Sequence, residues 1–257
     1  MLTKSIVPGS MALGATGDAS NAFKVASATA DVLKSFGINM NYGPIADINS
    51  EPKNPVIGVR SPSDDPETVG RFVSAQVKGL QQGGIVPCVK HFPGHGDTAV
   101  DSHYGLPVIS KSKLELETCE LVPFRRAVAE GVASVMTAHI SMPGIGESKL
   151  PASLSPDAIK ILREEMKYNG LIVSDCLEMD GVRATYGTEK SAVMALKVSR
   201  WPSLLFVLFF EQFGRVDFAA PVNSNSITQV LEGLMCFRHV CVKWLKNYTN
   251  RREQTVS

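Results

Sequence analysis

The chain of 257 residues is long enough to bury a sizeable core, as one large domain or two small ones. Its 26 basic and 25 acidic residues nearly cancel, to a net charge of +1, and they are interspersed. This balance argues against a surface for nucleic acid or for anionic lipid. The five cysteines are odd in number and form no CxxC pair, which argues against a disulfide framework or a zinc ribbon and favours a reducing compartment.

Two further features bear on location. The N-terminal residues lack a charged segment followed by an apolar one, so no signal peptide is visible and a cytoplasmic location is favoured. The longest apolar run, Leu204 to Phe210, is far shorter than the roughly 20 residues that a membrane-spanning helix needs. We therefore expect neither a membrane nor a nucleic acid as partner.

Helices and strands alternate along the sequence. Residues 1–19 have the character of a loop, and Ser20 or Asn21 is placed to cap the first helix. The other predicted helices and strands follow from the spacing of apolar residues and from the glycine and proline residues that end or begin each segment. The predicted helices span residues 20–35, 65–83, 112–130, 155–168 and 188–197; the predicted strands span 38–48, 85–91, 133–140 and 171–173, with 204–210 as a further candidate.

This alternation predicts an α/β fold with a parallel sheet, because each crossover between parallel strands needs a helix. Every predicted strand ends in polar residues, namely Asp47, Lys90 with His91, His139 and Asp175. In a (β/α)8 TIM-type barrel such strand ends open on one face, where active sites lie. A doubly wound open sheet would alternate in the same way, but no glycine fingerprint supports it. The pattern therefore favours the barrel.

The stretch from Lys90 to His103, KHFPGHGDTAVDSH, holds three of the five histidines. It follows a short apolar strand and contains glycine and proline, so it is a loop in which side chains can converge on a ligand. Three histidines in fourteen positions argue against a chance cluster of solvated side chains.

Two kinds of chemistry are compatible with these residues. Asp101 and His103 are separated by one residue, so the carboxylate can orient the imidazole and raise its basicity, which suits a general acid/base. Asp175 directly follows an apolar strand, where a carboxylate can serve as nucleophile, metal ligand or helix cap. A zinc-dependent hydrolase using His91, His95 and His103 is the alternative, although their spacings of four and eight residues match no familiar zinc signature.

The histidine stretch and several other segments resemble those of a known family. KHFPGHG followed by DSH is similar to the β-N-acetylhexosaminidase branch of glycoside hydrolase family 3. Segments 11–17, 41–49, 54–61 and 173–175 also resemble that family, and the resemblance runs in order from Val7 to Lys197. The related β-glucosidases share the Lys-His pair but lack the DSH segment. The resemblance therefore implies saccharide substrates that carry N-acetylglucosamine.

The resemblance also implies roles for individual residues. Asp175 matches the nucleophile of a retaining mechanism, and His103 matches an unusual acid/base with Asp101 as its partner. Most retaining glycosidases use two carboxylates instead, so the histidine is a variation on that scheme. No metal or other cofactor is implied. The positions matched to sugar binding are Lys90, His91, Arg60 and Asp47, and His139 is expected to line the same face.

The chain departs from the family in three places. Nothing before Val7 matches the family's first strand and its Asp-Glu-Gly-Gly segment, and Cys176 stands where a second aspartate usually follows the nucleophile. After Lys197 the resemblance stops. We therefore expect residues 1–197 to be a partial barrel domain and residues 198–257 to be a non-matching tail, which we interpret as translated intron or out-of-frame sequence. An uninterrupted coding transcript through codon 198 would contradict that interpretation.

An incomplete barrel has physical consequences. Unpaired strand edges and exposed apolar faces favour aggregation, so we expect the isolated chain to be poorly stable. A truncated, non-catalytic sugar-binding product is accordingly the alternative to an active glycosidase.

Overall fold

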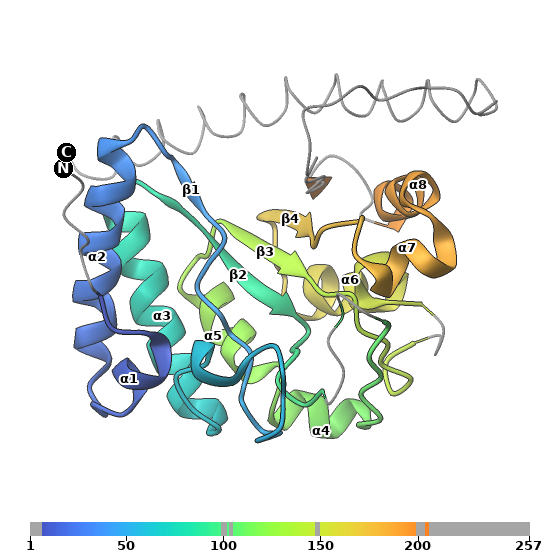
Figure 1. Ribbon diagram of the computed structural model, residues 1–257, viewed down its shortest axis with the longest axis horizontal. Helices are drawn as coiled ribbons and strands as arrows, with labels where there is room; N and C mark the ends of the chain where they lie inside the picture. Colours follow the sequence, from blue (N-terminus) through green and yellow to red (C-terminus); the bar gives the residue numbers. More distant parts are fainter. Residues whose placement is uncertain (1–6, 99–101, 103–104, 147–149, 199–203, 206–257) are drawn as a thin grey trace.

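Parallel strands form the centre of the structure, a computed structural model that describes residues 7–98, 102, 105–146, 150–198 and 204–205 (Figure 1). Within these ranges five strands lie side by side in chain order, and every neighbouring pair is parallel. Their bounds are β1 (Met40–Asn41), β2 (Val86–Phe92), β3 (Ser134–Thr137), β4 (Leu171–Ser174) and β5 (Leu204–Leu205).

Helices connect these strands, as parallel pairing requires. The α-helices are α1 (Ser10–Gly14), α2 (Ala19–Ser35), α3 (Pro66–Gln82), α4 (Lys113–Thr118), α5 (Val122–Ala129), α6 (Pro156–Lys160), α7 (Asp180–Tyr186) and α8 (Thr188–Val198). Short 3₁₀ turns occupy Gly58–Arg60 and Ala152–Leu154, and a π-helical turn, Ile161–Glu165, continues α6. The predicted alternation is confirmed. The described strands leave β1 and β5 as edges and do not close on themselves, which is the arrangement of an incomplete (β/α)8 barrel.

Side-chain caps explain where several helices begin. Asp65 accepts a hydrogen bond from the Thr68 N–H at 2.7 Å, and Pro66 occupies the first turn of α3, where its missing N–H costs nothing. Helix α2 is capped by Asp18, which accepts from the Ser20 N–H at 2.8 Å, so the predicted caps Ser20 and Asn21 are wrong.

The two faces of the sheet have different environments. Val89, Val135 and Ile172 lie in register and are buried in the main core, between the strands and the helices outside them. Cys88, Met136 and Val173 form a small cluster on the opposite face. Because strand side chains alternate between faces, Lys90 and Asp175, each two positions beyond a member of this cluster, fall on its face at the carboxyl ends of β2 and β4.

The predicted strand 38–48 is wrong beyond its first residues. The Val86 N–H donates to the Asn39 carbonyl, and the Cys88 N–H donates to the Gly43 carbonyl. The chain therefore advances four residues, from 39 to 43, opposite an advance of only two residues in β2, from 86 to 88. Pro44 has no N–H to continue the ladder. The segment that carries Asp47 is therefore irregular, and only an isolated bridge between Ile45 and Lys90 extends the pairing.

The predicted helix 112–130 is interrupted. Cys119 leaves the helical region, with φ −127° and ψ −89°, and Pro123 lies in the first turn of α5. The break at residues 119–121 turns Glu120 into the interior, where only 1% of its surface is exposed.

Three smaller predictions also need correction, and one helix was missed. Residues 1–19 were expected to be a loop, but α1 forms there, with Leu13 buried against α2 and Phe72. Strand 133–140 is shortened to β3, helix 155–168 is split into α6 and the π-helical turn, and α7 was not predicted.

The end of the described chain adds to the sheet. Leu204 and Leu205 pair with Ile172 and Val173, so the candidate strand 204–210 is confirmed at its first two residues. Residues 206–210, and nearly all of the predicted tail domain, lie outside the described part. Across the described ranges, no helix combines the length and apolarity needed to cross a bilayer.

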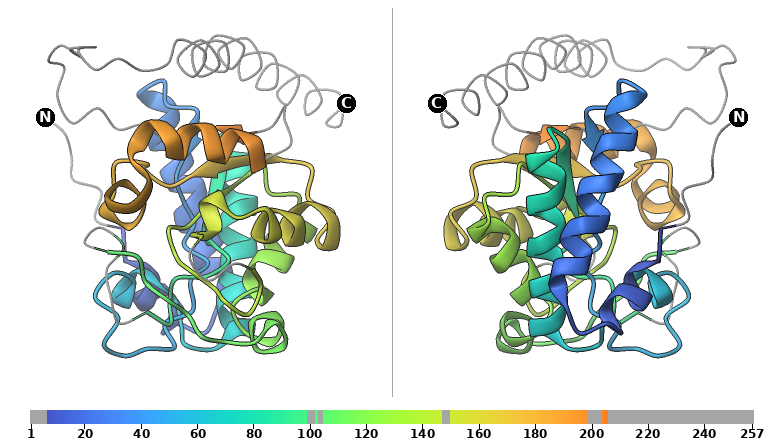
Figure 2. Two further views of the ribbon diagram at one scale, coloured as in Figure 1. Left: turned by 90° about the vertical axis from the view of Figure 1, so that its right-hand side faces the viewer. Right: turned by 90° about the vertical axis from the view of Figure 1, so that its left-hand side faces the viewer.

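A close approach of two helices gives a first prediction. Helices α2 and α3 lie side by side (Figure 2), and a Cβ at Gly79 would come within 2.6 Å of the Phe23 carbonyl oxygen. Replacing a helical glycine by alanine normally stabilises a helix by about 1 kcal/mol. Here we expect Gly79→Ala to lower the free energy of unfolding by about 1–3 kcal/mol, because the backbones must separate.

Urea titration measures the free energy of unfolding of both proteins. The control is Gln82→Ala, at an exposed position at the end of the same helix. A Gly79→Ala protein at least as stable as the parent would contradict the close packing.

Candidate active site

A buried carboxylate organises the turn that follows β2. Asp47 has no exposed surface, and its oxygens accept hydrogen bonds from the His91 N–H at 3.1 and 3.2 Å and from the His95 N–H at 2.7 Å. Burial alone would raise the pKa of Asp47, but its contacts with the two histidines outweigh burial and lower it. The carboxylate is therefore ionised and fixes two positions of the histidine stretch.

The same carboxylate sets the state of the His91 ring. Asp47 Oδ2 lies 2.6 Å from His91 Nδ1, and an ionised carboxylate can only accept a hydrogen bond. Nδ1 must therefore carry a proton, which leaves Nε2 to face other groups. His91 follows Lys90 at the carboxyl end of β2.

His95 is buried between two hydroxyl groups. Its Nδ1 lies 2.8 Å from Thr98 Oγ1, and its Nε2 lies 3.0 Å from Ser102 Oγ. Burial lowers the pKa of His95, so the ring is neutral at pH 7. Gly181, in α7, donates its N–H to the Ser102 carbonyl at 3.0 Å, so Ser102 is held from two sides.

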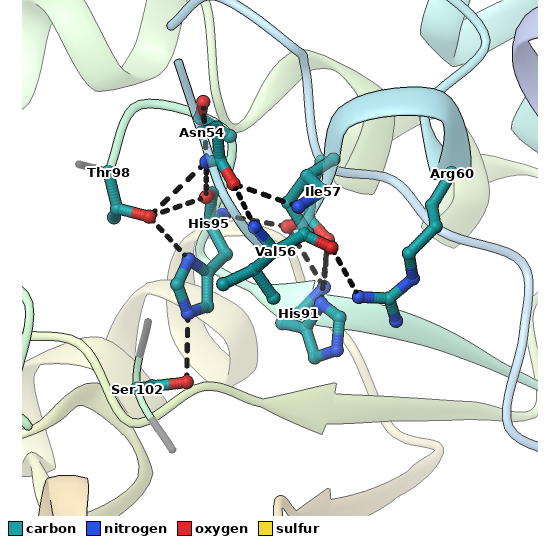
Figure 3. A network of polar contacts seen from close by, with 10 residues as sticks. Asn54, Val56, Ile57, Arg60, His91, His95, Thr98 and Ser102 are labelled. Atoms are coloured by element: carbon teal, nitrogen blue, oxygen red, sulfur yellow. Dashed lines mark hydrogen bonds and ion pairs between the residues drawn. The ribbon is translucent and has the colours of Figure 1, made fainter. Parts of the chain in front are cut away.

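Asn54 ties a second loop to the histidine stretch (Figure 3). Its Nδ2 donates to the carbonyls of His95 and Gly96 at 2.9 and 3.0 Å, and its Oδ1 accepts from the N–H groups of Val56 and Ile57, both at 2.8 Å. These bonds position the 3₁₀ turn that carries Arg60, whose Nη1 donates to the Val56 carbonyl at 2.9 Å.

Three charged side chains converge near this network. Burial lowers the pKa of Lys90; the Asp175 carboxylate opposes that shift, and the positive charge of Arg60 reinforces it. The net pKa lies below the usual value for a lysine. Lys90 and Asp175 lie on the same sheet face, so a cation and an anion share the carboxyl end of the strands.

Asp175 is fixed by the backbone on both sides. Its N–H donates to the Thr137 carbonyl at 3.0 Å, and its Oδ1 accepts from the Cys176 N–H at 2.8 Å. Burial alone would raise the pKa of Asp175, but the neighbouring His91 and His139 contribute most to lowering it. A partly exposed, ionised carboxylate with a fixed backbone is suited to nucleophilic attack.

His139 supports the backbone beside Asp175. Its ring has no exposed surface; Nδ1 lies 2.7 Å from Ser153 Oγ and Nε2 lies 2.8 Å from the Cys176 carbonyl oxygen. A carbonyl oxygen only accepts, so Nε2 carries the proton, and burial lowers the pKa of the ring. In this geometry His139 holds the residue that follows Asp175.

The structure thus brings six of the predicted residues into one region: Asp47, Arg60, Lys90, His91, His139 and Asp175. Asp47, which was matched to sugar binding, is fully buried beside His91, and its part in sugar binding stays a prediction. Asp101 and His103 lie outside the described residues, so the acid/base pair stays a prediction.

The contacts of the histidine rings bear on the alternative of a zinc site. Both ring nitrogens of His95 lie within hydrogen-bond distance of hydroxyl groups, and Nδ1 of His91 is bound to Asp47. Among the residues that the structure describes, no three histidine, cysteine or acidic side chains are grouped to hold a metal ion.

Sequence reasoning missed the supporting residues. Asn54 was part of a resembling segment but was assigned no role, and Ser102 was noted only as the residue between Asp101 and His103. An asparagine before a proline in a long loop is a weak signal for a buried amide. The contacts of Asn54 with His95 and Gly96 join positions more than forty residues apart, which no local pattern reveals.

Comparison with known proteins adds to this geometry. The sequence model described as "Glycosyl hydrolase family 3 N terminal domain" matches residues 2–199. A curated relative, "Beta-hexosaminidase A" of Pseudoalteromonas piscicida, is 42% identical over 190 residues, which cover 68% of this chain and 32% of the relative. "Beta-hexosaminidase" of Neisseria meningitidis serogroup C is 39% identical over 180 residues, covering 70% of this chain and 49% of the relative.

A solved structure agrees with these relatives. It is described as a glycoside hydrolase family 3 beta-N-acetylglucosaminidase from Paenibacillus sp., and it superposes with a TM-score of 0.76 at 46% identity. The match covers 79% of this chain and 39% of that protein. The match therefore covers between 32% and 49% of the length of these three proteins.

The buried carboxylate gives a second prediction. Because the folded-state pKa of Asp47 lies below the ordinary value of 3.8, the stability it contributes is present above that pH and is lost as the pH falls towards the folded-state pKa. We expect Asp47→Asn to lower the free energy of unfolding by about 3 kcal/mol at pH 7, because an amide cannot accept all the hydrogen bonds.

The difference between parent and variant should shrink below about pH 4. Urea midpoints recorded from pH 7 downward measure it, with the exposed Asp64→Asn as control. A difference that is small at pH 7, or that stays constant with pH, would show that the carboxylate is not ionised in the folded state.

Proposed function

The chain belongs to glycoside hydrolase family 3, and from that membership we propose that it removes terminal β-linked N-acetylglucosamine from saccharides by a retaining mechanism. The names of the relatives, beta-hexosaminidase and beta-N-acetylglucosaminidase, support the substrate class. The TIM-type barrel expected for this family agrees with the parallel strands and surrounding helices. Because the chain spans only part of those proteins, the activity is a proposal for this chain.

The observation that carries the proposal is the placement of Asp175. Its carboxylate is ionised, partly exposed and held at the carboxyl end of β4, on the sheet face that also carries Lys90. A nucleophile for the anomeric carbon needs these properties. A carboxylate whose only role was to cap the next helix would have no need of the nearby cationic groups.

In the first step of the proposed reaction, an oxygen of Asp175 attacks the anomeric carbon and the bond to the leaving oxygen breaks. His103, oriented by Asp101, gives its proton to that oxygen, and a glycosyl ester of Asp175 results. In the second step His103 takes a proton from water, the water oxygen attacks the anomeric carbon, and Asp175 is released. Two inversions at this carbon give overall retention.

The remaining residues bind and orient the sugar. The ammonium of Lys90 and the guanidinium of Arg60 supply charged hydrogen-bond donors for hydroxyl groups. Asp47 holds a proton on His91 Nδ1, so Nε2 is the ring nitrogen left to contact a sugar hydroxyl. We assign Asp47 and His139 to positioning, since both are buried and bonded to protein groups.

No metal enters this scheme. The division into a barrel domain, residues 1–197, and a tail, residues 198–257, remains a prediction. So does the alternative that the isolated chain binds N-acetylglucosamine saccharides without hydrolysing them.

Removal of the nucleophile gives the third prediction. We expect Asp175→Ala to lower kcat/KM for 4-nitrophenyl β-N-acetylglucosaminide on the order of 10³-fold or more, because no glycosyl ester can form. Release of nitrophenol measures it. Asp180→Ala is the control. Asp180 lies only five positions after Asp175, and its carboxylate pairs with Arg183 on the surface.

Equal activity in the parent and Asp175→Ala proteins would refute Asp175 as nucleophile. If neither protein releases nitrophenol but both bind N-acetylglucosamine, the non-catalytic alternative is correct for this chain.

A further inference from the structure

A buried histidine lies beside the residue that follows the proposed nucleophile. The register of β3 and β4 pairs Thr137 with Ser174, and the Asp175 N–H continues this pairing by donating to the Thr137 carbonyl at 3.0 Å. Two positions beyond that pair, His139 therefore falls level with Cys176. Its Nε2 lies 2.8 Å from the Cys176 carbonyl oxygen, which joins the chain after β3 to the chain after β4.

Both backbone polar groups of Cys176 shape the turn after β4. Its carbonyl oxygen also accepts from the Met179 N–H at 3.1 Å, so it has two donors. Its N–H donates to Asp175 Oδ1 at 2.8 Å. Fixing the backbone of Cys176 therefore fixes the orientation of the Asp175 carboxylate, because Oδ1 is engaged by this backbone donor.

Ser153 orients the His139 ring. Its Oγ lies 2.7 Å from Nδ1, and the ring has no exposed surface. Burial lowers the pKa of the ring, so it is neutral at pH 7 and carries its one proton on Nε2, towards the carbonyl oxygen. Nδ1 is then an acceptor, and the Ser153 hydroxyl must donate to it. We call Ser153, His139 and Cys176, which these two hydrogen bonds connect, the serine relay.

Ser153 is itself anchored to the core. Its N–H donates to the Ala138 carbonyl at 3.0 Å, and the Ala152 N–H donates to the Ile140 carbonyl at 2.8 Å, so this segment runs alongside the continuation of β3. Ser153 is 2% exposed and lies between Ala152 and Leu154, which belong to the main core. The serine relay therefore begins at a buried, hydrogen-bonded residue and ends next to Asp175.

We propose that Ser153 is a positioning residue for the nucleophile of this glycosidase. Through His139 it holds Cys176, which keeps Oδ1 of Asp175 on the Cys176 N–H and leaves Oδ2 to form the bond to the anomeric carbon as the leaving group departs. This inference rests on the proposed function. Ser153 is assigned no contact with substrate. It acts through the backbone, since misplacing a reacting atom by about 1 Å can cost about 10²-fold in rate.

Ser153→Ala is the informative variant. It removes the hydroxyl that donates to His139 Nδ1 and leaves every residue of the proposed sugar site unchanged. Ser134→Ala is a matched control: this serine, at the other end of β3, is fully buried, and its hydroxyl donates to the Pro87 carbonyl at 2.8 Å. Each substitution removes one buried hydroxyl donor. Ser153→Thr is the conservative variant, because it keeps the donor.

The kinetic test follows formation of the ester at Asp175. The probe is 5-fluoro-N-acetylglucosaminyl fluoride, whose fluoride leaves readily and whose ring fluorine slows hydrolysis of the ester. Intact-protein mass spectrometry gives both the rate of labelling and the final labelled fraction. We expect Ser153→Ala to lower the rate about tenfold at an unchanged labelled fraction. Ser153→Thr should restore most of the rate, and Ser134→Ala should change neither quantity.

Three outcomes would overturn the proposal. They are an unchanged rate in Ser153→Ala, an equal loss of rate in Ser134→Ala, and a Ser153→Ala protein in which the labelled fraction falls while the labelled molecules react at the parent rate. The last result would show that Ser153 serves only the stability of the fold.

A second measurement does not depend on activity. The N–H groups of Cys176 and Met179 are both bonded within the turn after β4, so hydrogen exchange of a peptide that spans residues 176–179 reports how firmly that turn is held. We expect faster exchange in Ser153→Ala than in the parent and in the two other variants. If the parent forms no ester, the proposed function fails for this chain, and exchange alone decides whether Ser153 holds the turn. Unchanged exchange would refute that role.

Discussion

The site depends on a carboxylate that is removed entirely from water. A buried charge is strongly unfavourable unless nearby groups compensate it, and Asp47 is compensated by two backbone N–H groups and one imidazole of the histidine stretch. That requirement fixes the turn after β2 in one geometry. Asn54 also fixes the histidine stretch, because the hydrogen bonds of its buried amide form only when the 54–60 segment and the histidine stretch lie together.

Parallel-strand geometry supplies the rest of the site. Alternation along β2 and β4 places Lys90 and Asp175 on one sheet face, and parallel pairing brings both to the same end. The irregular segment after β1 then delivers Asp47 beneath His91. Groups from three separate crossovers thus meet with little exposed surface, so their charges interact more strongly than they would in water.

Much of this was predictable from residues alone. Apolar runs ending in polar residues identified the strands and placed Asp175 and Lys90 correctly at their ends. The position of Asp47 could not be predicted, because its partners lie more than forty residues away and Gly43–Pro44 disrupts the strand that was predicted to carry it. The inward turn of Glu120 could not be predicted for a similar reason. Residues 112–130 have the composition of one continuous helix, and the break between α4 and α5 depends on tertiary packing.

We propose that this network prepares Asp175 to form a bond to the sugar. It is tested most directly by incubating the chain with an activated N-acetylglucosaminyl donor whose ring fluorine slows hydrolysis of the ester, followed by peptide mass spectrometry. We expect one sugar residue attached to the peptide that contains Asp175, at the carboxylate of that residue. Turnover of the donor with the sugar attached elsewhere, or with no covalent adduct at all, would contradict it.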